Sequence, residues 1–148
     1  MEVVRQKAGS VLGVVVGAIL QLTSSALEAQ PASPVDPALR RLVEAELRRD
    51  LADAFAMNGR PAQLVIQGVD LDGDGRVDAI VLMDHPYSCG SAGCAVHVFI
   101  SEGSRLRRVG EFLANEVEPV TTSTEGWRDL SVNGRRWALQ DGRYRVVR

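Results

Sequence analysis

Apolar residues between positions 36 and 59 recur at the spacing of one helical face. These residues are Leu39, Leu42, Val43, Leu47, Leu51, Ala54 and Phe55. Asp36 followed by Pro37 is typical of a helix start, because the aspartate side chain caps free backbone N–H groups and proline suits the first helical position. Asn58-Gly59, with a proline shortly after it, is typical of a helix end. The pattern predicts one N-terminal amphipathic helix that packs on a sheet.

After residue 61 the pattern changes to short runs rich in β-branched residues. The runs 63–70, 77–84 and 94–101 are apolar on both faces, so we expect them in the middle of a sheet. Weaker strand patterns follow, at 105–114, 118–123, 127–132, 135–140 and 143–148. Asn133-Gly134 and Asp141-Gly142 are strong hairpin turns. The sequence predicts an α+β domain over residues 36–148, with the helix packed on a mostly antiparallel sheet of six or seven strands.

The N-terminus has the layout of a secretory signal peptide. Arg5 and Lys7 precede an uncharged apolar run over 8–22, and small residues lead to Ala29. We therefore predict a signal peptide over 1–29, a linker over 30–35, and a periplasmic or secreted protein. The apolar run is shorter than the ~20 residues of a spanning helix, so no stable membrane span is expected after cleavage. The alternative is an anchor that is not cleaved.

Composition narrows the function classes. The formal net charge is −2, which argues against a nucleic-acid surface. Cys89 and Cys94 are the two cysteines of the chain, and export predicts that they form a disulfide. Free or redox-active thiols and a metal site are the alternatives. Gly90 and Gly93 between them allow the sharp turn that a short loop needs.

The segment DLDGDGRVD, residues 70–78, is the strongest functional signal. Asp70, Asp72, Asp74 and Asp78 stand at positions 1, 3, 5 and 9 of a calcium loop, and the backbone carbonyl of Arg76 would serve at position 7. Four carboxylates this close would repel one another without a cation. The pattern predicts calcium as a structural ligand, with weak affinity because position 12 is Val81 rather than a bidentate glutamate. The alternative is a solvated turn between two strands.

The residues of this loop, followed by an apolar strand, resemble the strand–loop–strand calcium loops of FG-GAP and VCBS-type repeats. The segments DLDGDG, YSCGSAGC and GWRDLSV, in this order, also resemble small exported bacterial proteins of uncharacterised function. The resemblance implies export and a single domain. It implies no activity.

The sequence favours a binding or accessory protein of the bacterial envelope over an enzyme. A glycine-rich loop closed by a disulfide between Cys89 and Cys94 would be rigid. Aromatic and arginine side chains near such a loop are common interface anchors. The expected partner-binding residues are Tyr87, Ser91, Trp127 and Arg128. The partner is an unknown protein or glycan of the cell envelope.

Two alternatives remain for the function. One is a periplasmic inhibitor or immunity-type protein, by analogy with other rigid-loop proteins. The other is a small hydrolase that uses Asp84 and His85 as an acid/base pair. His97 shares a strand face with Ala95 and Phe99, and we expect it to be a core histidine.

Overall fold

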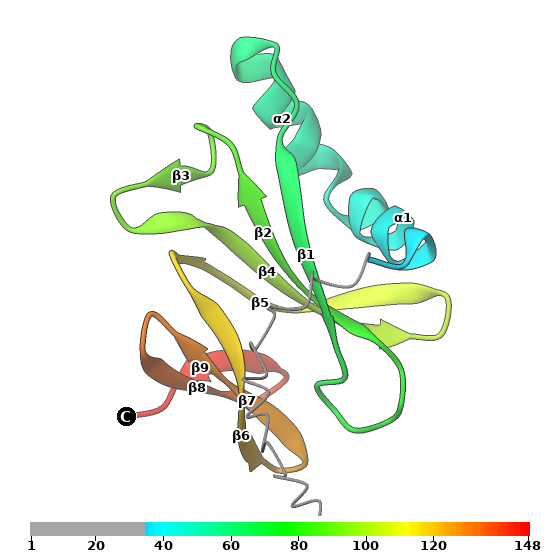
Figure 1. Cartoon of the computed structure of the whole chain (residues 1–148), viewed down its shortest axis with the longest axis vertical. Helices are drawn as coiled ribbons and strands as arrows, with labels where there is room; N and C mark the ends of the chain where they lie inside the picture. Colours follow the sequence, from blue (N-terminus) through cyan, green and yellow to red (C-terminus); the bar gives the residue numbers. More distant parts are fainter. Residues whose placement is uncertain (1–34) are drawn as a thin grey trace, which may run out of the picture. The chain divides into compact units, whose positions relative to one another are not determined.

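The computed structural model describes residues 35–148, so the predicted signal peptide and nearly all of the linker lie outside the described part. The α+β class is confirmed: two helices precede nine strands (Figure 1). The helices are α1 (Pro37–Glu46) and α2 (Arg48–Asn58). The strands are β1 (Gln63–Val69), β2 (Asp78–Asp84), β3 (Cys89–Gly90), β4 (Gly93–Glu102), β5 (Arg105–Ala114), β6 (Val117–Thr124), β7 (Trp127–Val132), β8 (Arg135–Gln140) and β9 (Arg143–Val146).

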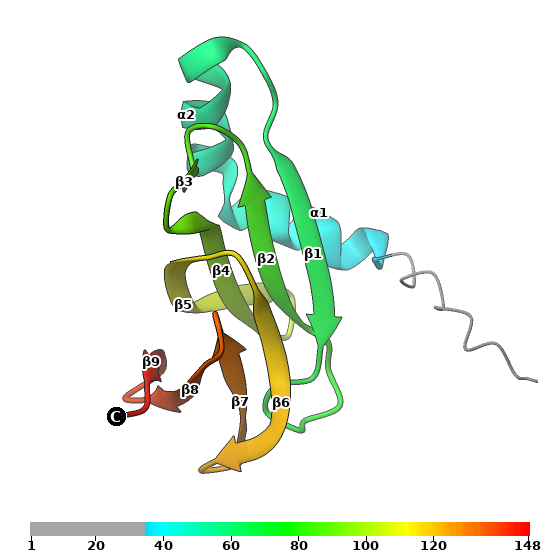
Figure 2. The same cartoon turned by 60° about the vertical axis from the view of Figure 1, so that its left-hand side comes forward.

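The helical segment starts and ends where its capping residues indicate. The Asp36 side chain accepts a hydrogen bond from the backbone N–H of Ala38 at 2.9 Å, and Gly59 closes α2 in the left-handed conformation. The segment is nevertheless two helices, because the chain turns at Leu47 (Figures 1 and 2). Leu47 itself is fully buried. The turn therefore keeps the central leucine in the core while α2 takes a new direction.

The apolar stripe of the helical segment is only partly buried. Leu39 and Val43 of α1 are buried, whereas α2 buries Ala54 alone. Phe55, which the pattern placed on the packed stripe, is 55% exposed. The change of direction at Leu47 explains this, because it turns the stripe of α2 out of line with that of α1.

The strands form two antiparallel sheets rather than the single sheet that we expected. Sheet A has the order β1-β2-β4-β3, with β5 also paired to β4, and sheet B has the order β6-β7-β8-β9. The boundary falls between β5 and β6, which are consecutive along the chain but lie in different sheets. A break in pairing at this point leaves no mark in the hydrophobic pattern.

Sheet A is the middle layer, because apolar residues pack on both of its faces. One cluster joins it to the helices: Leu39, Val43, Leu47, Ile66, Ala79, Val81, Phe99 and Leu106. The other joins it to sheet B and includes Leu71, Ile80, Val96, Val98, Ile100, Val109, Ala114, Leu130, Val132, Leu139 and Tyr144. Double-sided burial explains why β2 and β4 are apolar on both faces.

The first strand differs from its prediction. Among the described strands β1 pairs only with β2, so it forms an edge of sheet A, and Val65 on it is 61% exposed. The expected hairpin turns are present, since Asn133 and Asp141 have φ values of 48° and 50° before their glycines. A third turn of the same kind at Glu125-Gly126 joins β6 to β7.

Candidate functional site

The aspartate loop, residues 70–77, joins β1 to β2, and its two ends are held by the pairing of Val69 with Asp78. Gly73 and Gly75 have φ values of 76° and 82°, so both occupy the left-handed region that favours glycine. Asp70 organises the turn: its two oxygens accept backbone N–H groups from Gly73 at 2.7 Å and from Gly75 at 3.0 Å. The glycines therefore let the backbone fold around this carboxylate.

Three of the four predicted carboxylates come together. Asp70, Asp72 and Asp78 each present an oxygen within 4.8 Å of the others, in an arrangement that could hold a metal ion. Carboxylate oxygens at this spacing suit a hard cation. We call these three residues the carboxylate cluster.

Asp74 is not part of the carboxylate cluster. Its carboxylate accepts a hydrogen bond from Nε of Arg76 at 2.7 Å and also pairs with Nη2 of the same guanidinium. These hydrogen bonds hold the pKa of Asp74 below its usual value. The Arg76 side chain thus pairs with Asp74, while the expected role of its backbone carbonyl as a ligand stays a prediction.

Asp78 is the buried member of the cluster. One of its oxygens accepts the backbone N–H of Leu71 and the other that of Ser101 on β4, each at 2.8 Å. Burial raises the pKa of the Asp78 carboxyl, although the two N–H groups act in the opposite direction. A cation bound nearby would favour the charged form and lower that pKa.

The aspartate loop is anchored in the junction between the two sheets. The Leu71 side chain is 1% exposed and belongs to the core between them. The Leu71 carbonyl accepts the backbone N–H of Arg128 on β7 at 2.7 Å, and the Arg128 carbonyl accepts the Tyr144 hydroxyl at 2.6 Å. The loop that carries the carboxylates thus connects sheet A to sheet B.

The predicted disulfide between Cys89 and Cys94 is present. The two cysteines are directly opposite each other in the β3–β4 pairing. We call residues 86–94 the disulfide hairpin. Ser88 fixes its base, because the Ser88 hydroxyl donates to the Met83 carbonyl at 2.8 Å. The Asp84 carboxylate lies near both sulfurs, but oxidised sulfurs are not thiolate ligands, so this group does not make a metal site.

The expected partner-binding residues do not form one surface. Tyr87 and Ser91 belong to the disulfide hairpin, which follows the end of β2. Arg128 is hydrogen-bonded to the aspartate loop at the start of β2, and Trp127 is its neighbour on β7. A strand of seven residues spans roughly 20 Å. The disulfide hairpin and the aspartate loop therefore lie at opposite ends of β2.

His85 has structural partners on both ring nitrogens. Nε2 is 3.1 Å from Oδ1 of Asn58 at the end of α2, and Nδ1 accepts the backbone N–H of Tyr87 at 3.0 Å. This assigns the proton to Nε2. Within residues 35–148, Asp84 is not a partner of the ring. His85 therefore ties α2 to the disulfide hairpin and is not arranged as an acid/base pair with Asp84.

His97 lies on the helix-facing side of β4, where its ring centroid is 6.2 Å from that of Phe99. Its side chain is 2% exposed, and neither ring nitrogen has a hydrogen-bond partner among the described residues. Burial lowers the pKa of His97, and the charge of Arg108 acts in the same direction. The imidazole is therefore neutral at pH 7, as expected of a core histidine, but its polar atoms are unsatisfied.

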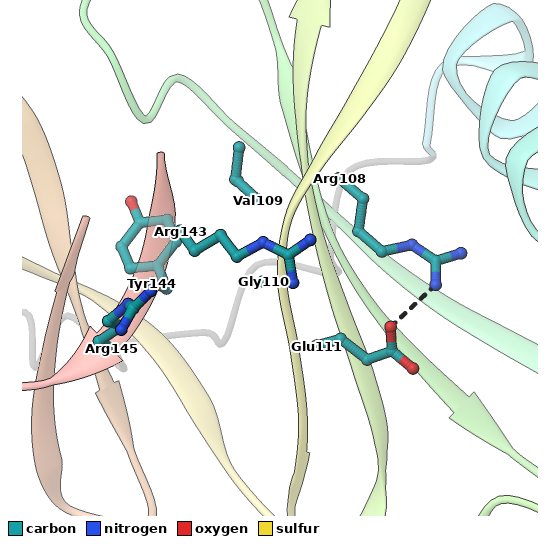
Figure 3. A pocket seen from close by; sticks show the side chains of 7 residues that line it. All are labelled: Arg108, Val109, Gly110, Glu111, Arg143, Tyr144 and Arg145. Carbon is teal, nitrogen blue, oxygen red and sulfur yellow. Dashed lines mark hydrogen bonds and ion pairs between the residues drawn. The ribbon is translucent and has the colours of Figure 1, made fainter. Parts of the chain in front are cut away.

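An arginine pocket of about 510 Å³ lies between β5 and β9, and the sequence did not suggest it. Arg108, Arg143 and Arg145 line it together with Glu111 and Tyr144 (Figure 3). Arg108 pairs with Glu111 at 3.0 Å. The alternation in Arg143-Tyr144-Arg145 does place both arginines on one face of a strand. Nothing in the neighbouring sequence, however, indicates that β5 forms the other side of the pocket.

Comparison with protein-family models, with curated proteins and with solved structures finds no match. Between residues 35 and 148, neither helix has the length and apolar composition needed to cross a bilayer.

Proposed function

We propose that this chain is an exported accessory protein of the bacterial envelope, which binds a protein or glycan partner through its disulfide hairpin. Calcium bound at the carboxylate cluster stabilises the folded protein and takes no part in catalysis. The observation that carries the proposal is the convergence of three carboxylates, two from the aspartate loop and one from the start of β2, where that loop is anchored between the two sheets. The disulfide is consistent with an oxidising compartment.

The choice of calcium follows from the ligand chemistry. The cluster offers only oxygen ligands, which hard cations prefer: Asp70 and Asp72 come from the glycine-containing aspartate loop, and Asp78 comes from the start of β2. Magnesium demands a tight octahedron and releases its waters reluctantly, so it suits such a loop less well. Because the cluster has three carboxylates, we expect weak affinity, with a Kd of ~10⁻⁴–10⁻³ M.

The hydrolase alternative draws no support from the two histidines. Both nitrogens of His85 are engaged in holding α2 and the disulfide hairpin together. His97 is buried against Phe99. A binding function, in contrast, is supported by Tyr87, because this aromatic side chain on the disulfide hairpin is 45% exposed and available to a partner.

We expect calcium to raise the melting temperature of the protein. At a calcium concentration about 100 times the Kd, the stabilisation is roughly 2.7 kcal/mol. Asp72→Asn should remove most of this gain, because it removes one charge from the cluster. Without calcium the Asp72→Asn protein should be at least as stable as the parent, because carboxylate repulsion is relieved. Thermal unfolding in calcium, magnesium and chelator measures these effects.

Asp74→Asn is the matched control for this experiment. It removes the same charge from the same loop, but at a residue that pairs with Arg76 and lies outside the cluster. It should keep most of the calcium response. Equal melting temperatures of the parent in calcium and chelator would show that the loop is a plain turn. Equal losses in the two variants would show that the ligand set is wrong.

The binding part of the proposal predicts that capture of a partner depends on Tyr87. Immobilised parent protein should retain the same envelope protein or glycan as Val65→Ala, while Tyr87→Ala should retain much less. Val65 is a suitable control because it is 61% exposed on the β1 edge, outside the disulfide hairpin. Identical capture by all three proteins, measured in envelope extracts, would contradict binding through the disulfide hairpin.

A further inference from the structure

A hollow of about 500 Å³ lies on the helix-facing side of sheet A, beside the disulfide hairpin. We call it the hairpin hollow. Its walls come from α2, the disulfide hairpin and the ends of β2, β4 and β5: the lining includes Asp50, Tyr87, Ser88, His97, Glu111 and Leu113. We propose that the hairpin hollow receives an arginine side chain of a protein partner. This inference rests on the proposed binding function and names the chemistry of the partner.

The lining of the hairpin hollow contains a histidine whose ring nitrogens are unsatisfied in the described part of the chain. His97 is 2% exposed and lines the hollow, and both its ring nitrogens lack partners within residues 35–148. Buried polar atoms are nearly always hydrogen-bonded, because an unmade bond leaves the cost of desolvation uncompensated. A neutral imidazole can accept one N–H group from a ligand. An entering guanidinium group supplies such a donor.

The lining of the hairpin hollow is also negatively charged. Asp50 and Glu111 line the hollow, and no arginine or lysine does so among the described residues. The Arg108 guanidinium, outside the lining, is 3.4 Å from Asp50 and 3.0 Å from Glu111, so one cation is shared by two carboxylates. These three charged groups leave one negative charge uncompensated. The hollow therefore favours a cationic occupant.

The number of acceptors in the lining, and their origin on separate elements, favour guanidinium over ammonium. Two carboxylates and an imidazole nitrogen come from different elements, namely α2, β5 and β4. Guanidinium carries five N–H donors in a planar fork and can meet several acceptors at once, whereas ammonium is a compact point charge that holds its water strongly. Lysine should consequently bind more weakly than arginine.

The rim of the hollow suits the rest of an arginine side chain. Tyr87 is 45% exposed and Leu113 is 52% exposed, and both line the hollow. Their apolar surfaces can cover the methylene stem, and the tyrosine ring can stack on the planar cation. The Cys89–Cys94 bond and the Ser88 hydrogen bond hold this wall in place before binding. A preformed wall lowers the ordering cost of association.

NMR titration of the protein with three small probes tests the inference. The probes are Nα-acetyl-arginine amide, its uncharged isostere Nα-acetyl-citrulline amide, and N-acetylglucosamine. The arginine derivative should shift the His97 ring and Leu113 methyl resonances, and it should bind about tenfold more tightly than the citrulline derivative. Glu111→Gln should weaken its binding about tenfold, while Glu118→Gln, an exposed change on β6, should not.

Three results would overturn the inference. Equal binding of the arginine and citrulline derivatives would show that charge is not recognised. Absence of any shift at His97 would show that the hollow is not the site. Binding of N-acetylglucosamine there in place of the arginine derivative would point to a glycan. None of these results alters the calcium response or the dependence of partner capture on Tyr87, so the proposed function is tested separately.

Discussion

Leu71→Ala should lower the free energy of unfolding by about 2–5 kcal/mol, one of the two largest effects that we expect. Leu71 lies in a loop that reads as polar and solvated, yet its side chain is 1% exposed and packs in the core between the sheets. Truncation removes buried methyl groups and leaves a cavity that the rigid sheets cannot close. Urea denaturation of parent and variant measures the difference.

Val77→Ala is the control for Leu71→Ala. Val77 belongs to the same loop but is 52% exposed, so its truncation should change stability by no more than about 0.5 kcal/mol. Both variants keep all four aspartates of the segment. Similar losses in the two proteins would mean that Leu71 does not anchor the loop. An unchanged midpoint for Leu71→Ala would mean that the loop is not part of the core.

The anchoring of Leu71 bears on the carboxylate cluster. Its backbone N–H donates to Asp78 and its carbonyl accepts from Arg128, so the residue between Asp70 and Asp72 is held on three sides. A cluster built on a fixed backbone needs little reorganisation to accept a cation. Leu71→Ala should thus weaken the calcium response as well as the fold.

The sequence predicts best those features that depend on neighbouring residues. The disulfide and the turns at Asn133-Gly134 and Asp141-Gly142 are present because their chemistry is local: left-handed residues close a tight turn, and cysteines opposite each other in a hairpin meet. The apolar character of β2 and β4 also survives, because both strands are buried on both faces.

Features that depend on distant partners were missed. The bend at Leu47 and the separation of β6 from sheet A leave no trace in hydrophobic periodicity. The pairing of Asp74 with Arg76 is a different case, because it is local: the spacing predicts Asp74 as a ligand, whereas its carboxylate pairs with the side chain two residues later. The arginine pocket and the hairpin hollow both need strands or helices that are far apart along the chain.

Gly93→Ala should lower the free energy of unfolding by more than about 3 kcal/mol, because two separate effects combine. Gly93 has a φ of 105°, in a region that side chains with a Cβ avoid. An added Cβ would also overlap the backbone carbonyl group of Ala114 and lie 2.7 Å from the backbone nitrogen of Asn115. Thermal unfolding should show a fall in melting temperature of roughly 10 °C or more for a domain of this size.

Gly90→Ala distinguishes a specific requirement at Gly93 from general sensitivity of the disulfide hairpin. Gly90 pairs with Gly93, but no described atom lies within 4 Å of a Cβ placed there, so alanine should be tolerated with a change within about 0.5 kcal/mol. The overlap at Gly93 is with backbone atoms, so adding Ala114→Gly to Gly93→Ala should not restore stability. Restoration in the double variant, or equal losses at Gly90 and Gly93, would contradict close backbone packing between the hairpin and the end of β5.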